Sequence, residues 1–171
     1  LARSQLSQSS GLIRDQFLSA VMRGALPAEA RSDLFVRARE MDIDLLARQY
    51  RVMLLSPAQP APEQMLPLRA LISRLTEARA GMQGLFCRFE GLILLLLKGE
   101  TGEELDEGAF WLAQTVKHEA EVPLRIAIGA VVSHVFALGD SYQAALRTLQ
   151  AMNDHYARED TRIMDSAELQ L

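Results

Sequence analysis

The sequence is poor in the residues that cross-link small secreted proteins or hold metal ions. It contains one cysteine and three histidines among 171 residues. A single cysteine cannot close a disulfide within the chain, so we expect a reducing compartment and a cytoplasmic protein. His118, His134 and His155 are widely separated and form none of the short spacings typical of metal ligands. The sequence therefore predicts no metal site and no cofactor.

Long apolar runs and an excess of basic residues are also missing. The longest apolar run, Leu92 to Leu97, is far shorter than the roughly 20 residues that cross a bilayer, so we expect no membrane partner. Lysine and arginine together number 18 against 22 aspartates and glutamates, which gives a net charge of −4. This balance does not attract the chain as a whole to nucleic acid.

The sequence does contain enough apolar residues to build a core, and its first part has helical periodicity. Apolar residues make up 49% of the chain. Near the N-terminus a narrow apolar stripe of the kind found in coiled-coil seams recurs every three or four residues. The stripe consists of Leu6, Ile13, Phe17, Ala20 and Val21. Gly24 and Pro27 end this helix, and a second amphipathic helix is predicted from Ala28 to Met41.

We interpret residues 1–48 as a helical linker and dimerisation arm. The stripe predicts a homodimer in which the first helix pairs with its copy, although the same stripe could pack on the sheet of its own chain.

Residues 49–171 have the pattern of an α+β domain. Predicted strands lie at 50–56, 84–89, 92–98, 124–130 and 162–164, and predicted helices begin near Pro67, Thr101 and Asp140. Glu90-Gly91 has the length of a two-residue hairpin turn between two strands. The order after the helical arm is β-α-β-β-α-β-α, and its first six elements predict a ferredoxin-like antiparallel sheet with helices on one face.

Residues that could carry out catalysis do not form a recognisable set. Cys87 lies between Phe86 and Arg88 in a predicted strand, where a small buried side chain is expected. The segment 99–102 follows a strand and precedes a helix but lacks the residues of a phosphate-binding loop. Asp106, Glu107, Glu119 and Glu121 fall on exposed helical positions. We therefore predict no catalytic residues.

The predicted hairpin nevertheless resembles that of GGDEF domains. Arg88-Phe89, then Glu90-Gly91 and an apolar strand, is similar to their arginine-aromatic pair, acidic turn and following strand. Here the Gly-Gly pair and both acids of the signature are reduced to Glu90-Gly91. Ser56-Pro57 ends the first strand, where active diguanylate cyclases carry a metal-binding aspartate. The resemblance therefore implies a degenerate domain that is not an enzyme, because two-metal phosphoryl transfer needs close carboxylates.

A second set of segments resembles the degenerate GGDEF-like domains of bacterial transcription regulators. The segments are 14–24, 38–43, 126–129, 140–149 and 162–169. In the second of these, Asp42 stands where the family usually has glycine. Two kinds of regulator carry such domains: YesN-type response regulators with an AraC-type DNA-binding domain, and regulators resembling PucR and CdaR.

The resemblance implies a non-catalytic central domain that couples an upstream input domain to a downstream helix-turn-helix domain in a two-component regulator. DNA would then be bound only through a domain outside this chain. The alternatives are a divergent nucleotide-binding or cyclase-like enzyme and a small-ligand sensor, for which the sequence offers no polar cluster. The input signal, the ligand and the operator are not specified by these residues.

Overall fold

The computed structural model describes residues 2–78, 83–155 and 160–170. Its helices are α1 (Ala2–Arg23), α2 (Leu34–Glu40), α3 (Met65–Ala78), α4 (Gly102–Glu119) and α5 (Leu138–His155). Its strands are β1 (Gln49–Pro57), β2 (Gln83–Phe89), β3 (Leu92–Gly99), β4 (Leu124–Val132) and β5 (Arg162–Asp165). Short 3-10 turns lie at Ala28–Ala30, Pro62–Gln64, Val135–Ala137 and Ser166–Gln170. The α+β class predicted from the sequence is confirmed.

The strands form one sheet in the order β2-β3-β1-β4-β5. The neighbouring pairs β2-β3, β3-β1 and β1-β4 are each antiparallel, as expected of the ferredoxin-like plan. The expectation of an antiparallel sheet fails only at β5, which pairs with β4 in parallel. The reason is that α5 carries the chain back along the sheet between the two strands, and such a crossover makes them parallel.

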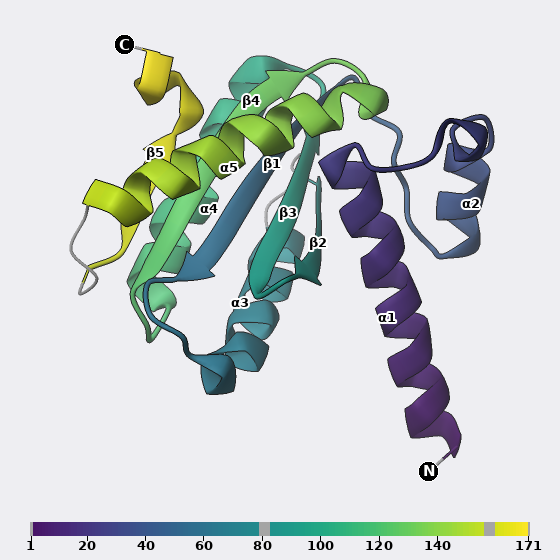
Figure 1. Cartoon of the computed structure of the whole chain (residues 1–171), viewed down its shortest axis with the longest axis horizontal. Helices are drawn as coiled ribbons and strands as arrows, with labels where there is room; N and C mark the ends of the chain where they lie inside the picture. The colour runs from purple at the N-terminus through teal and green to yellow at the C-terminus, as the bar shows by residue number, and fades with distance from the viewer. Residues whose placement is uncertain (1, 79–82, 156–159, 171) are drawn as a thin grey trace.

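Helices cover both faces of this sheet (Figure 1). The helices α3 and α4 pack on one face, over residues such as Met53 and Leu55 of β1. The helices α5 and α1 pack on the opposite face, over residues such as Val52 and Leu54. Because β1 is buried on both faces, its residues form a continuous apolar run instead of an alternating one. The helices α3 and α4, which belong to the ferredoxin-like plan, thus share one face as expected, and α5, which follows that plan, covers the other face.

Helix α1 is anchored at one end only. Phe17, Leu18, Val21 and Met22 are buried in the same core as α5 and the sheet. At the end of α1, Gly24 adopts a positive φ of 68° and lies against Gly139 at the start of α5, where a Cβ on Gly24 would approach the Gly139 Cα to 2.9 Å. Figure 1 shows the N-terminal half of α1 extending away from the sheet.

Two predicted helix boundaries are wrong. The helix expected from Ala28 is a 3-10 turn at Ala28–Ala30 followed by α2, because Ser32 and Asp33 favour turns over helix interiors. Helix α5 starts at Leu138 and not after Asp140, because a 3-10 turn runs directly into it. Asp140 thus lies in the first turn, where its negative charge stabilises the helix dipole.

Among the residues that the structure describes, no helix combines the length and the apolar character needed to cross a membrane.

Candidate functional site

The β2-β3 hairpin has the geometry that its sequence predicts. Phe89 pairs with Leu92, so the turn consists of Glu90 and Gly91 alone. Their φ angles are 49° and 80°. Two consecutive positive φ angles characterise the type I′ turn, whose twist matches that of the flanking strands. The turn therefore projects from the sheet with Glu90 exposed.

The end of β1 lies beside this turn. Leu55 of β1 pairs with Ile93 of β3, so Ser56 and Pro57 reach the level of the hairpin turn. The two positions where active cyclases hold their metal ions are thus adjacent in this fold. The groups found there are a serine hydroxyl, a proline ring and the single carboxylate of Glu90. A single carboxylate does not provide the bridging ligands that two Mg²⁺ ions require.

A third feature is the close packing of Gly129 on Ser141, which lie in two of the segments that resemble the GGDEF-like domains. A Cβ built on Gly129 of β4 would lie 2.2 Å from the Ser141 carbonyl oxygen, so only glycine permits α5 to pack this closely. The Ser141 hydroxyl accepts a hydrogen bond of 2.9 Å from the Val52 amide. That amide lies where the β1-β4 register shifts between Arg51 and Met53. These residues fix α5 on the central strands.

Comparison with known protein families identifies the family of this chain. Residues 24–151 match the family described as the GGDEF-like domain. The chain belongs to this family. The match begins at the Gly24 contact and ends within α5, so it includes residues 24–48 of the predicted arm and the strands β1 to β4.

One solved structure shares the fold of this GGDEF-like domain. It is described as "Crystal Structure of Regulator of Polyketide Synthase Expression from Bifidobacterium adolescentis", with a TM-score of 0.50 and 14% sequence identity. The alignment covers 86% of this chain and 55% of that one, so the present chain spans about half the length of its structural neighbour. No curated protein sequence matches the chain.

Within the described residues of the GGDEF-like domain, no group of three or more histidine, cysteine, aspartate or glutamate side chains is placed to hold a metal ion. His118 and His134 are exposed, and the side chain of His155 lies outside the described residues. Cys87 is fully buried, and burial raises the pKa of its thiol to about 12. Such a thiol stays protonated and unreactive at neutral pH.

The loop between β3 and α4 uses its own side chains at the helix start. Thr101 Oγ1 accepts a hydrogen bond of 3.1 Å from the Glu104 amide, as a capping residue should. The Glu104 carboxylate accepts a hydrogen bond of 3.0 Å from the amide of Glu100 and not from that of Thr101, so it does not complete a capping box with Thr101. The negative side chains of Glu103 and Glu104 occupy the first turn, where a bound anion would be repelled.

A buried arginine is the main charged group that the sequence analysis missed. Arg51 in β1 donates from Nε to the Gly129 carbonyl at 2.7 Å. Its two terminal nitrogens pair with Asp106 of α4 at 2.6 Å and with Asp165 of β5 at 2.7 Å. Asp106 is therefore exposed, as predicted, and also part of an ion-pair network. This network joins three elements and satisfies the guanidinium.

The five residues of the predicted dimerisation stripe have different environments. Phe17 and Val21 are buried within this chain, and Ala20 is half-buried. Ile13 is 56% exposed, and its neighbour Leu12 is 62% exposed. The side chain of Leu6 lies outside the described residues. Among the α1 side chains that the structure describes, the exposed large apolar ones, Leu12 and Ile13, thus precede the anchored segment.

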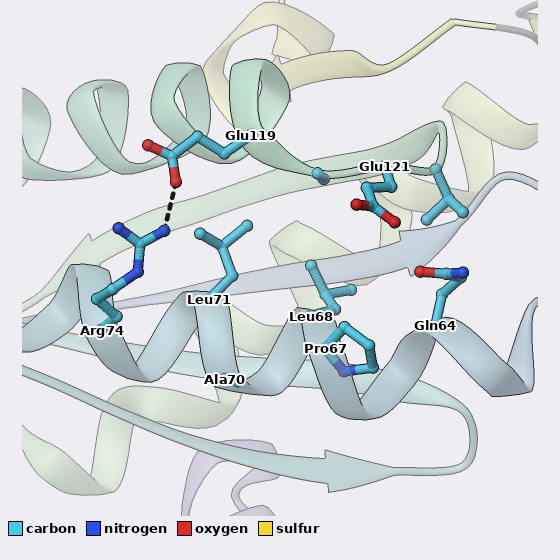
Figure 2. Close-up of a pocket in the computed structure, with 10 residues that line it drawn as sticks. Gln64, Pro67, Leu68, Ala70, Leu71, Arg74, Glu119 and Glu121 are labelled. Carbon is cyan, nitrogen blue, oxygen red and sulfur yellow. Dashed lines mark hydrogen bonds and ion pairs between the residues drawn. The ribbon is translucent and has the colours of Figure 1, made fainter.

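A groove runs between α3 and α4 (Figure 2). Leu68 and Leu71 of α3 line it, and Arg74 closes one end through an ion pair of 2.5 Å with Glu119. Gln64, in the 3-10 turn before α3, and Glu121, just after the end of α4, line its other end (Figure 2). The groove, of about 370 Å³, contains no convergent set of charges of one sign.

A larger cavity, of about 880 Å³, lies between α1, α3 and the hairpin turn. We call it the arginine cavity because four arginines from three elements line it. They are Arg14 and Arg23 of α1, Arg69 of α3 and Arg88 of β2. Two carboxylates, Asp15 and Glu90, also line it.

Proposed function

We propose that this GGDEF-like domain is a non-catalytic regulatory domain of a cytoplasmic bacterial transcription regulator. In that protein it would connect an input domain, through α1, to a helix-turn-helix domain that binds DNA. The family assignment supports the domain type. The shared fold with a protein described as a regulator of polyketide synthase expression supports the setting. Fold likeness alone does not fix function, so the proposal rests on the site.

The observation that carries the proposal is the composition of the β1 end and the hairpin turn. The fold retains their adjacency, because Leu55 pairs with Ile93 beside the turn. The chemistry at this place is reduced to Ser56, Pro57 and Glu90. The place of a phosphoryl-transfer site thus keeps its geometry but has a single carboxylate, which fits a signalling role better than a catalytic one.

We further propose that α1 mediates a homodimer through its projecting half. Phe17 and Val21 are already buried against the chain's own sheet, so the intermolecular contact must lie before them. Leu12 and Ile13 provide exposed apolar surface there. The projecting half of α1 has only about the 12–15 residues at which an isolated helix is marginal in water, and pairing with a second copy would stabilise it. The anchored half of α1 would then relay a change in pairing to α5 through Gly24 and Gly139.

Sedimentation equilibrium of Ile13→Asp tests the dimer. The wild type should be a dimer at micromolar concentration, and the variant should be a folded monomer because the new charge would be desolvated in the seam. The matched control is Leu66→Asp, which places the same charge at an apolar residue of α3 that is 75% exposed. The control should remain dimeric. A monomeric wild type, or a variant that stays dimeric, contradicts pairing through α1.

Of the two architectures, we propose the YesN-type response regulator with an AraC-type DNA-binding domain over the PucR and CdaR arrangement. The narrow apolar stripe of α1 fits a helical linker that follows a receiver domain. The complete open reading frame tests this choice directly. A receiver domain upstream supports it, and any other sensory domain contradicts it.

A further inference from the structure

The arginine cavity has an excess of positive charge inside a protein whose net charge is −4. Four arginines line it against two carboxylates. Asp15 lies 3.7 Å from Arg69, which pairs those two charges weakly. Among the residues that the structure describes, no carboxylate lies within ion-pair distance of Arg14, Arg23 or Arg88. The cavity therefore has guanidinium groups that have no ion-pair partner in the described part of the chain.

Aromatic rings hold two of these guanidinium groups in place. The Arg23 guanidinium carbon lies 3.9 Å from the centroid of the Phe89 ring, and that of Arg69 lies 5.6 Å from the centroid of Phe86. Stacking on a ring orients a guanidinium and leaves its N–H donors free for another partner. The Nε of Arg23 is buried and has no hydrogen-bond acceptor in the described part of the chain.

The two aromatic rings lie on opposite faces of β2, which is an edge strand of the sheet. Phe89 packs against the core beneath α1 and α5, and Phe86 packs against the core beneath α3 and α4. Arg23 of α1 and Arg69 of α3 thus stack on the two sides of one edge strand, and both line the arginine cavity.

We propose that the arginine cavity binds a small molecule that carries a phosphate or pyrophosphate group. Guanidinium groups bind phosphate oxygens through paired, charge-assisted hydrogen bonds, and a phosphate dianion matches an excess of two positive charges. Phe89 provides apolar surface for the rest of such a molecule. The ligand would join α1 to α3 and the hairpin, at the place where α1 leaves the domain. It would thereby fix the angle of the arm.

The arginine cavity is a different site from the end of β1, because two of its four arginines come from α1. Binding there requires neither a dimer nor any turnover. A failure of this inference and a failure of the proposed function are therefore distinguishable.

Isothermal titration of the 171-residue chain with inorganic pyrophosphate tests the inference at physiological ionic strength, where nonspecific surface attraction is screened. We expect saturable binding with one site per chain. Arg88→Gln should weaken it about tenfold, since one charge-assisted contact is lost. Glu90→Gln should strengthen it, because a repelling carboxylate is removed from the cavity.

Arg147→Gln is the matched control, because Arg147 is an exposed arginine on α5 and does not line the cavity. It should leave the affinity unchanged. Thermal unfolding without ligand shows whether each variant is folded, and the gain expected of Glu90→Gln cannot arise from misfolding. Succinate in place of pyrophosphate tests the ligand class and should bind more weakly.

Three results overturn the inference. The first is the absence of saturable binding to the wild type. The second is an equal loss of affinity in Arg147→Gln and Arg88→Gln, which would indicate nonspecific attraction. The third is succinate binding as tight as that of pyrophosphate, which would assign the cavity to carboxylates.

Discussion

Gly129 and Ser141 are in such close contact that a methyl group on the glycine would lie 2.2 Å from the serine carbonyl oxygen. The contact sets the distance between β4 and α5. It also places the Ser141 hydroxyl where the Val52 amide donates to it. The glycine at position 129 and the serine at position 141 are therefore explained by packing.

Gly129→Ala should destabilise the protein by about 3 kcal/mol, because the helix backbone must move away from the sheet. Urea unfolding followed by circular dichroism measures the change. Gly11→Ala is the matched control, since no atom lies within 4 Å of a Cβ placed there. Alanine at that helical position should raise stability by about 0.5–1 kcal/mol. A Gly129→Ala protein as stable as the wild type would show that α5 is not held by this contact.

Asp42→Gly should stabilise the protein. Asp42 has a φ of 58°, a left-handed conformation that is strained for residues with a side chain and that glycine adopts freely. Release of this strain should contribute up to about 1 kcal/mol, less the added entropy of glycine in the unfolded chain. The midpoint of urea unfolding should move to higher urea. A lower midpoint would mean that the aspartate makes a stabilising interaction that outweighs the strain.

Arg51→Met should cost about 2–3 kcal/mol. The change leaves the Gly129 carbonyl and two carboxylates without their donor, although Asp106 is exposed enough to be hydrated. Arg48→Met is the control, because the Arg48–Glu100 pair is exposed and should contribute less than about 1 kcal/mol. Equal effects of the two changes in urea unfolding would refute the role given to the buried network.

Cys87 should resist alkylation in the folded protein. Burial raises the pKa of its thiol from 9.0 to about 12, so almost no thiolate exists at pH 8. The sign of the pH dependence follows: the unfolded chain loses this proton above about pH 9 while the folded one keeps it, so the contribution to stability falls as pH rises toward 12. Iodoacetamide at pH 8 should label the chain only in denaturing urea. Rapid labelling of the native protein would contradict this placement of Cys87.

The parts of the fold that the sequence predicted depend on local signals. The turn at Glu90-Gly91 and the end of α1 at Gly24 are set by glycine and strand periodicity within a few residues, and the structure confirms both. The boundaries near Ala28 and Asp140 were wrong because short 3-10 turns have no strong pattern of their own.

The charged sites escaped prediction because they are assembled from distant segments. Arg51 meets Asp106 and Asp165 only after the sheet has formed. The arginine cavity combines residues 14, 23, 69 and 88, whose spacing in the sequence shows no pattern. The apolar stripe of α1 was visible, but the point where its burial within the chain begins, at Phe17, depends on how the helix crosses β2.

The central claim is that this GGDEF-like domain regulates without catalysis, and GTP turnover tests it most directly. The purified chain is incubated with GTP and Mg²⁺ or Mn²⁺, and pyrophosphate release is followed against a heat-inactivated sample. We predict release no faster than in that control, because Ser56, Pro57 and Glu90 cannot hold two metal ions. Steady release that is lost in Glu90→Gln would contradict the claim.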